Sequence, residues 1–123
     1  MSIKVAIVGL GRVGSVFLEE VLKHQDRGID VRAVAELEET PGVEMARKAG
    51  IACLTIDAIV GLADPVDLIF DLSGSDTVRR LLRDLMTITS EHHTVVVPEI
   101  VTQLVWRLMT DRALPDVHAH KGY

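Results

Sequence analysis

Short runs rich in Val and Ile alternate along this chain with longer stretches whose apolar residues follow helical spacing. The runs cover residues 3–8, 29–35, 51–54, 66–72 and 94–97. Parallel strands need a crossover of a dozen or more residues, which a helix usually supplies, and such crossovers are right-handed. The alternation therefore predicts an α/β fold: a doubly wound parallel sheet of about five strands in the order 3-2-1-4-5, with helices on both faces in three αβα layers.

The stretches between these runs carry helix signals of their own. Apolar residues recur at positions 13, 16, 17 and 21, which predicts a helix over residues 12–24. Thr40 is a good N-cap before Pro41, and Gly50 suits the end of a helix over 41–49. Further helices are expected over 56–62, after the cap at Ser75 or Asp76, and after Pro98.

Composition limits the class of protein. Of the 123 residues, 48% are hydrophobic and 25% are charged, so we expect residues 1–123 to form one globular domain. The net charge of −5, without a basic stripe, argues against nucleic acid and anionic membrane surfaces as partners. A lone Cys53 allows no internal disulfide, and the apolar stretch 5–11 is too short for a signal peptide or a membrane span. We therefore expect a cytoplasmic protein.

The junction after the first predicted strand carries a G-x-G-x-x-G pattern, Gly9-Leu10-Gly11-Arg12-Val13-Gly14. In this context Gly9 makes a tight turn, Gly11 lets a pyrophosphate approach the backbone, and Gly14 lets helix and strand pack closely. The pattern alone is weak evidence. A buried strand before it, a helix after it and an acidic residue ending the second strand strengthen it together.

That acidic residue is Glu36, at about the expected distance from the last glycine. A carboxylate there accepts hydrogen bonds from the adenine ribose and repels a 2′-phosphate, so NAD is expected in preference to NADP. The only nearby cation that could bind this 2′-phosphate is Arg32, which lies inside the second predicted strand. The alternative reading is that the glycines form a tight turn and Glu36 is a solvated strand end.

These residues, with Asp71-Leu72-Ser73-Gly74, resemble the NAD(P)-binding Rossmann domain of oxidoreductases related to glucose-fructose oxidoreductase, homoserine dehydrogenase and aspartate dehydrogenase. They are also similar to the small Rossmann modules of some bacterial signalling proteins. The resemblance implies three groups of cofactor-binding residues. They are Gly9, Leu10, Gly11, Arg12 and Val13 along the pyrophosphate, Glu36 at the adenine ribose, and Ser73 and Gly74 at the nicotinamide side.

The sequence departs from these oxidoreductases in two ways. The fifth run is followed by Pro98-Glu99 without the lysine of their Glu-Lys-Pro pattern, and 123 residues leave no substrate domain. The favoured hypothesis is therefore an NAD(H)-binding module with a nucleotide-sensing or regulatory role, not a self-sufficient enzyme. One alternative is a dehydrogenase-like domain or subunit whose substrate wall comes from a partner chain. The other is a degenerate Rossmann scaffold for protein interaction.

The remaining candidates for catalysis or metal binding are supported by weaker sequence signals. Cys53 lies within an expected strand and is read as a small core residue, and Asp71 as a general base or a loop cap. The histidines with Glu91 at 92–93, and those at 118 and 120, give no complete metal-ligand set, so no metal site is expected.

The last predicted helix carries an apolar stripe expected to face the core, formed by Ile100, Val101, Leu104, Val105 and Leu108. Trp106 lies outside that stripe. A large aromatic residue on the outer side of a helix often marks an interface. The sequence therefore predicts a homodimer through this helix, near Trp106.

Overall fold

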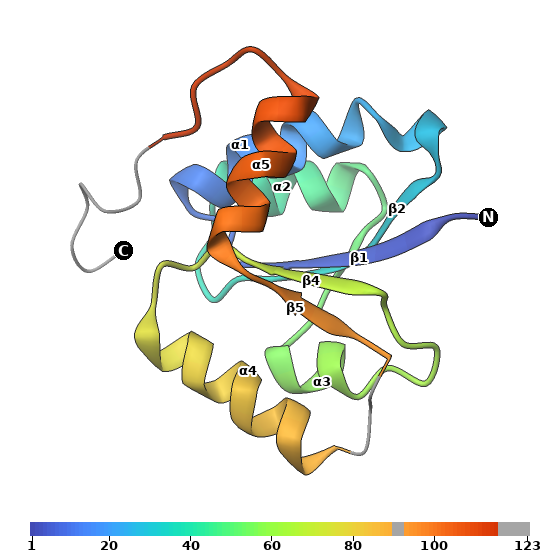
Figure 1. Cartoon of the computed structure of the whole chain (residues 1–123), viewed down its shortest axis with the longest axis vertical. Coiled ribbons are helices and arrows are strands. Elements are labelled where there is room, and N and C mark those ends of the chain that lie inside the picture. The colour runs from blue at the N-terminus through green and yellow to red at the C-terminus, as the bar shows by residue number, and fades with distance from the viewer. Residues whose placement is uncertain (90–92, 116–123) are drawn as a thin grey trace.

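The computed structural model describes residues 1–89 and 93–115. Within these ranges the chain forms one parallel sheet with helices on both faces (Figure 1). The strands are β1 (Ile3–Val8), β2 (Ile29–Ala35), β3 (Ala52–Cys53), β4 (Leu68–Asp71) and β5 (Val95–Val97). The helices are α1 (Arg12–Leu22), α2 (Pro41–Lys48), α3 (Ile56–Val60), α4 (Asp76–Ile88) and α5 (Glu99–Met109), with a short 3₁₀ turn at Gln25–Arg27.

The strand order is β3-β2-β1-β4-β5, and every pairing is parallel. The expected fold class and order are thus confirmed. The strand order reverses at β1: one branch of the chain runs outward through β2 and β3, and the other through β4 and β5. In such sheets a crevice forms where the order reverses, at the carboxyl ends of the strands.

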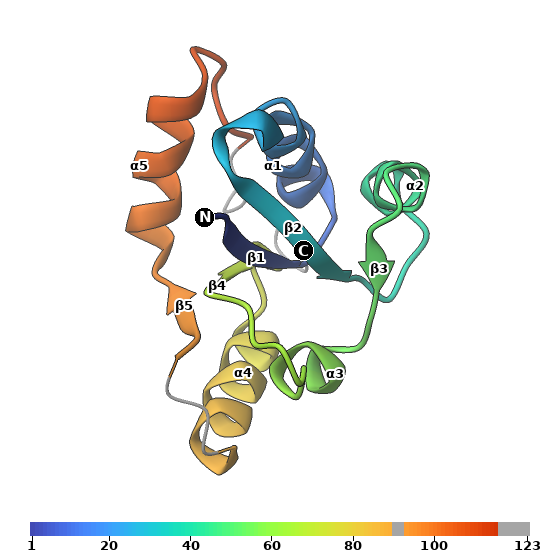
Figure 2. The same ribbon diagram turned by 90° about the vertical axis from the view of Figure 1, so that its right-hand side faces the viewer.

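The sheet separates two apolar cores. Helices α1, α2 and α5 cover one face, and α3 and α4 cover the other (Figures 1 and 2). Alternate residues of β1 point to opposite faces of the sheet. Val5 and Ile7 pack in the core under α1, α2 and α5, and Ala6 and Val8 pack in the core under α3 and α4. This burial on both faces explains why β1 reads as a continuous apolar run.

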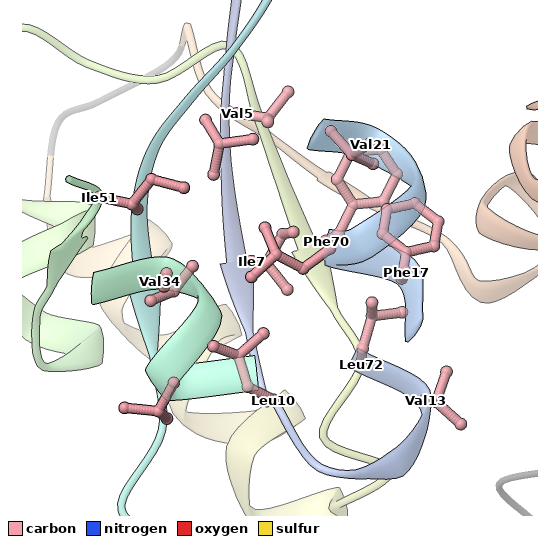
Figure 3. Packing of buried hydrophobic residues seen from close by; sticks show 14 of the residues in the cluster. Val5, Ile7, Leu10, Val13, Phe17, Val21, Val34, Ile51, Phe70 and Leu72 are labelled. Carbon is pink, nitrogen blue, oxygen red and sulfur yellow. The ribbon is translucent and has the colours of Figure 1, made fainter. Parts of the chain in front are cut away.

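Aromatic rings form the centre of the larger core. Phe17 of α1 lies 5.0 Å from Phe70 of β4, measured between ring centroids, and Figure 3 shows both rings between α1 and the sheet. Phe17 also stacks on Trp106 of α5, at 6.2 Å and an interplanar angle of 27°. The contacts among these three rings pack α5 against α1 on this face of the sheet.

The expected orientation of α5 is wrong. Trp106 is 2% exposed, whereas Ile100, Leu104 and Leu108 of the expected core stripe are 74%, 56% and 79% exposed. Burying the indole removes a large apolar area from water, and its Nε1–H finds a partner by donating to the Arg112 carbonyl at 2.7 Å. The proposed contact through an exposed Trp106 is therefore corrected, and the outer face of α5 is apolar instead.

Two other expectations also differ from the structure. Cys53 is exposed, because β3 is a two-residue strand at the edge of the sheet and not a buried strand. The fourth strand was expected over residues 66–72, but β4 spans only Leu68–Asp71. Asp67, just before it, accepts the backbone N–H of Lys4 at 2.8 Å with its carboxylate.

Removing the Trp106 side chain tests the orientation of α5. Trp106→Ala should lower the free energy of unfolding by about 3–5 kcal/mol, since it leaves a cavity beside Phe17. Leu108→Ala, on the exposed face, should change it by only about 0.5 kcal/mol. Urea unfolding followed by far-UV circular dichroism measures both variants. A larger loss for Leu108→Ala than for Trp106→Ala would contradict the packing.

Candidate functional site

The glycine loop joins β1 to α1 at the centre of the carboxyl edge. Gly9 has φ +93°, a left-handed conformation that favours glycine. A Cβ on Gly9 would lie 2.6 Å from the Ser73 backbone, so the turn after β1 touches the turn after β4. A Cβ on Gly14 would overlap the Gly9 carbonyl oxygen and lie 2.8 Å from the carbonyl carbon. Helix α1 therefore sits directly against the loop.

The N-terminus of α1 carries no side-chain cap. Gly11 is the N-cap residue and offers no side chain, and the first turn holds no acidic residue. Backbone N–H groups at a helix start can bind an anion, and the helix dipole favours negative charge there. Leu10 is completely buried, so its contribution to a ligand site comes from its backbone.

Glu36 follows β2 and reaches the same loop. Its Oε1 accepts the Leu10 N–H at 2.7 Å, and its Oε2 accepts the N–H groups of Leu37 and Glu38 at 3.0 and 3.2 Å. The structure thus brings Glu36 and the glycine loop together, whereas the roles expected of them in binding a dinucleotide stay predictions. The hydrogen bonds of Glu36 to the loop backbone were not foreseen.

The turn after β4 is held by its own side chains. Asp71 accepts from the backbone N–H and the hydroxyl of Ser73, at 3.1 and 2.7 Å. The Ser73 hydroxyl in turn accepts the Ser75 N–H at 3.2 Å, and Ser75 caps α4 through the Val78 N–H. Asp71 therefore caps the loop in this structure, which is one of its two expected roles. Gly74 completes the turn with φ +65°.

A cavity of about 850 Å³ opens beside these turns. Its walls include Val13 and Gly74 on the side of the two turns, and Thr102, Gln103 and Trp106 on the side of α5. The wall formed by α5 was not predicted from the sequence. The spacing of Thr102 and Trp106, four residues apart, was the available signal, because it places both on one face of the helix.

The segment after α5 forms a further wall of the cavity, through Arg112, Ala113 and Leu114. Arg112 donates to Glu19 at 2.8 Å and to Glu20 at 2.9 Å, which fastens this segment to α1. Burial by itself would raise the pKa of Glu20, but hydrogen bonds from Arg112 and Lys23 outweigh it and lower the pKa. Glu20 is therefore ionised and paired although its side chain is buried.

The remaining candidates do not join the site. Arg32 is paired with Asp30 at 2.5 Å and with Asp64 at 3.2 Å. His93 bonds to Asp67, whose pKa is lowered first by the Lys4 N–H and then by His93.

No metal site appears in the described part of the chain. Residues 1–89 and 93–115 contain no group of three His, Cys, Asp or Glu side chains placed to hold a metal ion. The other histidine candidates, His92, His118 and His120, lie outside the described residues, as does Glu91. Among the helices described, none is both long and apolar enough to cross a membrane.

Comparison with known proteins gives an informative similarity. No protein-family model matches the chain. The chain is similar to acetaldehyde dehydrogenase 2 of Salinispora arenicola (strain CNS-205), at 40% identity over 80 residues. The matched part is 63% of this chain and 27% of that dehydrogenase, so the chain spans well under two thirds of its relative.

This similarity and the parallel sheet together support a Rossmann-like domain of the dehydrogenase type. The coarse part of the expected resemblance, an oxidoreductase-type domain, is thereby supported. The particular oxidoreductase families and the bacterial signalling modules remain predictions.

A methyl group at Gly14 tests the close packing of the loop. Gly14→Ala should lower the free energy of unfolding by about 1–3 kcal/mol, because α1 has to move away from the Gly9 carbonyl. Gly61→Ala is the matched control: its Cβ would lie 3.3 Å from the Asp57 carbonyl oxygen, which needs a shift of only a few tenths of an ångström, so its stability loss should be smaller than that of Gly14→Ala. Thermal unfolding measures both. Equal stability of Gly14→Ala and the wild type would contradict the geometry.

Acid unfolding tests the bond between the segment after α5 and α1. The pKa of Glu20 is lowered in the folded state, so its contribution to stability is present above the unfolded pKa of about 4.3 and is lost as the pH falls below it. Arg112→Gln removes one cause of the lowered pKa. We expect its free energy of unfolding to fall less steeply than that of the wild type between about pH 5 and pH 3.

The control for this experiment is Arg107→Gln, which removes the same charge from an exposed position on α5. Its acid dependence should follow that of the wild type. Identical slopes for Arg112→Gln and the wild type would show that the pairing with Glu20 does not operate.

Proposed function

We propose that this chain binds NAD(H) at the carboxyl edge of its sheet, as the dinucleotide-binding domain of a dehydrogenase-type oxidoreductase. One observation carries the proposal. Gly14 packs so closely on the Gly9 carbonyl that α1 starts at the loop itself, and its N-terminus has no side-chain cap. This arrangement lies between β1 and β4, where the strand order reverses and such sheets bind ligands.

The residues present fit a dinucleotide. The backbone of Gly9 to Gly14 would lie along the pyrophosphate, and Glu36 stands at the end of β2, where the adenine ribose is expected. Ser73 and Gly74 would lie at the nicotinamide side, next to the cavity bounded by α5. When bound, the nicotinamide supplies hydride transfer; the side chains of this cavity bind, orient and exclude water.

The charges around Glu36 favour NAD over NADP. Two further acidic residues, Glu38 and Glu39, follow Glu36 closely in the sequence. Glu39 forms an ion pair with Arg47, which raises the pKa of Arg47. Arg32 is already held by two aspartates. A 2′-phosphate at this place would lie close to carboxylates, while the nearby Arg32 and Arg47 are already in ion pairs. The repulsion between the negative charges makes its binding unfavourable.

The dehydrogenase interpretation is preferred to a regulatory module for two reasons. The relative found is named as an acetaldehyde dehydrogenase, and the chain covers only 27% of it. The outer face of α5 is also apolar, with Ile100, Leu104 and Leu108 exposed, and such faces are commonly covered by another domain or chain. A substrate wall from outside these residues is therefore part of the proposal. The homodimer expected through the last helix also stays a proposal, now through this outer face.

Nucleotide binding is tested by thermal unfolding of the protein with NAD, NADH, NADP and NADPH in separate samples. A ligand at a hundred times its Kd stabilises the folded state by about 2.7 kcal/mol. We expect a rise in Tm with NAD or NADH and a much smaller one with the phosphorylated forms. Gly11→Val should abolish the rise, since a branched side chain then stands where the pyrophosphate must approach.

Gly61→Ala, far from the loop in sequence, is the control for Gly11→Val and should keep the response to NAD. The absence of a shift with all four nucleotides would contradict the proposal and favour a scaffold for protein interaction. An undiminished shift in Gly11→Val would place the nucleotide elsewhere.

A further inference from the structure

The Glu36 carboxylate is nearly saturated by backbone donors. It accepts N–H groups from Leu10, Leu37 and Glu38, at 2.7, 3.0 and 3.2 Å. Two carboxylate oxygens offer about four acceptor positions, so about one is left for a ligand. A residue whose sole task is to hold a ribose diol would keep both oxygens open.

The shortest of these bonds enters the glycine loop. Leu10 stands between Gly9 and Gly11, and its side chain is completely buried; a Cβ added to Gly42, at the start of α2, would lie 3.1 Å from the Leu10 Cβ. The neighbouring Gly9 N–H donates to the Ala35 carbonyl at 2.8 Å. The end of β2 therefore holds two successive peptide groups of the loop, one through its backbone and one through the Glu36 side chain.

We propose that Glu36 is a positioning residue for the glycine loop: by holding the Leu10 N–H it orients the backbone that receives the pyrophosphate. This inference rests on the proposed function, because it concerns the same dinucleotide site. Ribose recognition then uses the acceptor position that remains. The affinity of the site depends on the length of this side chain as well as on its charge.

Two substitutions separate length from charge. Glu36→Asp keeps the charge, but it is one methylene shorter, so we expect its carboxylate to lose the 2.7 Å bond to the Leu10 N–H. Glu36→Gln keeps the length and one acceptor oxygen, but it is neutral. If Glu36 acted on the ribose by charge alone, Asp would replace it well and Gln would not, since either acid serves that role in dinucleotide sites.

The first measurement is hydrogen exchange of the Leu10 amide, followed by NMR on the full chain without nucleotide. Loss of a bond to a charged acceptor should speed this exchange by at least about tenfold in Glu36→Asp. We expect Glu36→Gln to speed this exchange less than Glu36→Asp does, because its one oxygen can still accept the Leu10 N–H although the acceptor is no longer charged. Glu38→Gln is the matched control, removing a charge from the same turn.

The second measurement uses ADP and 2′,3′-dideoxy-ADP, which lacks both ribose hydroxyls, as calorimetric probes. Glu36→Asp should weaken both ligands by a similar factor of about ten, because the phosphate-binding backbone is disturbed. Glu36→Gln should bind dideoxy-ADP with an affinity within about threefold of that of the wild type. The same substitution should lower the affinity for ADP more than the affinity for dideoxy-ADP.

The opposite result in Glu36→Asp overturns the inference: an exchange rate of the Leu10 amide equal to that of the wild type, together with full affinity for dideoxy-ADP. Failure of the proposed function looks different. If the wild type binds neither probe, the dinucleotide site is refuted, while the exchange rates of the Leu10 amide still decide whether Glu36 holds the loop.

Discussion

The contact between Gly14 and the Gly9 carbonyl sets the geometry on which the rest of the carboxyl edge depends. Because no side chain separates them, α1 begins immediately at the end of β1 and its axis is fixed relative to the sheet. The same turn touches the Ser73 backbone, so the two central turns share one close contact. The core follows from this placement, since Phe17 of α1 then reaches both Phe70 and Trp106.

In helix α5 the widest apolar stripe is not the face that packs against the core. Its residues 100, 101, 104, 105 and 108 form a wide apolar stripe, and counting apolar residues assigns that stripe to the core. In the structure a narrower face, with Thr102 and Trp106, packs inward. One indole stacked on Phe17, with its N–H bonded to the Arg112 carbonyl, outweighs several aliphatic side chains.

The sequence predicted where the candidate residues stand relative to the strands, but not the bonds among them. Gly9 and Gly14 follow β1 and Glu36 follows β2, as their spacing indicated, because the tight turn and the parallel crossover fix these spacings; their role in binding stays a prediction. The partners of Glu36 were not foreseen, since spacing does not say which backbone groups a carboxylate will meet. The wall formed by α5 and Arg112 depends on contacts between segments more than 90 residues apart.

The sequence by itself determined the alternation of elements, the strand order and the place of the glycine loop, because short-range rules govern turns, helix starts and crossovers. The tertiary structure decided which face of α5 is buried, why Cys53 is exposed at an edge, and how Glu36 is held by the loop. Those outcomes depend on competition among side chains for the same buried space and the same donors, which no local pattern records.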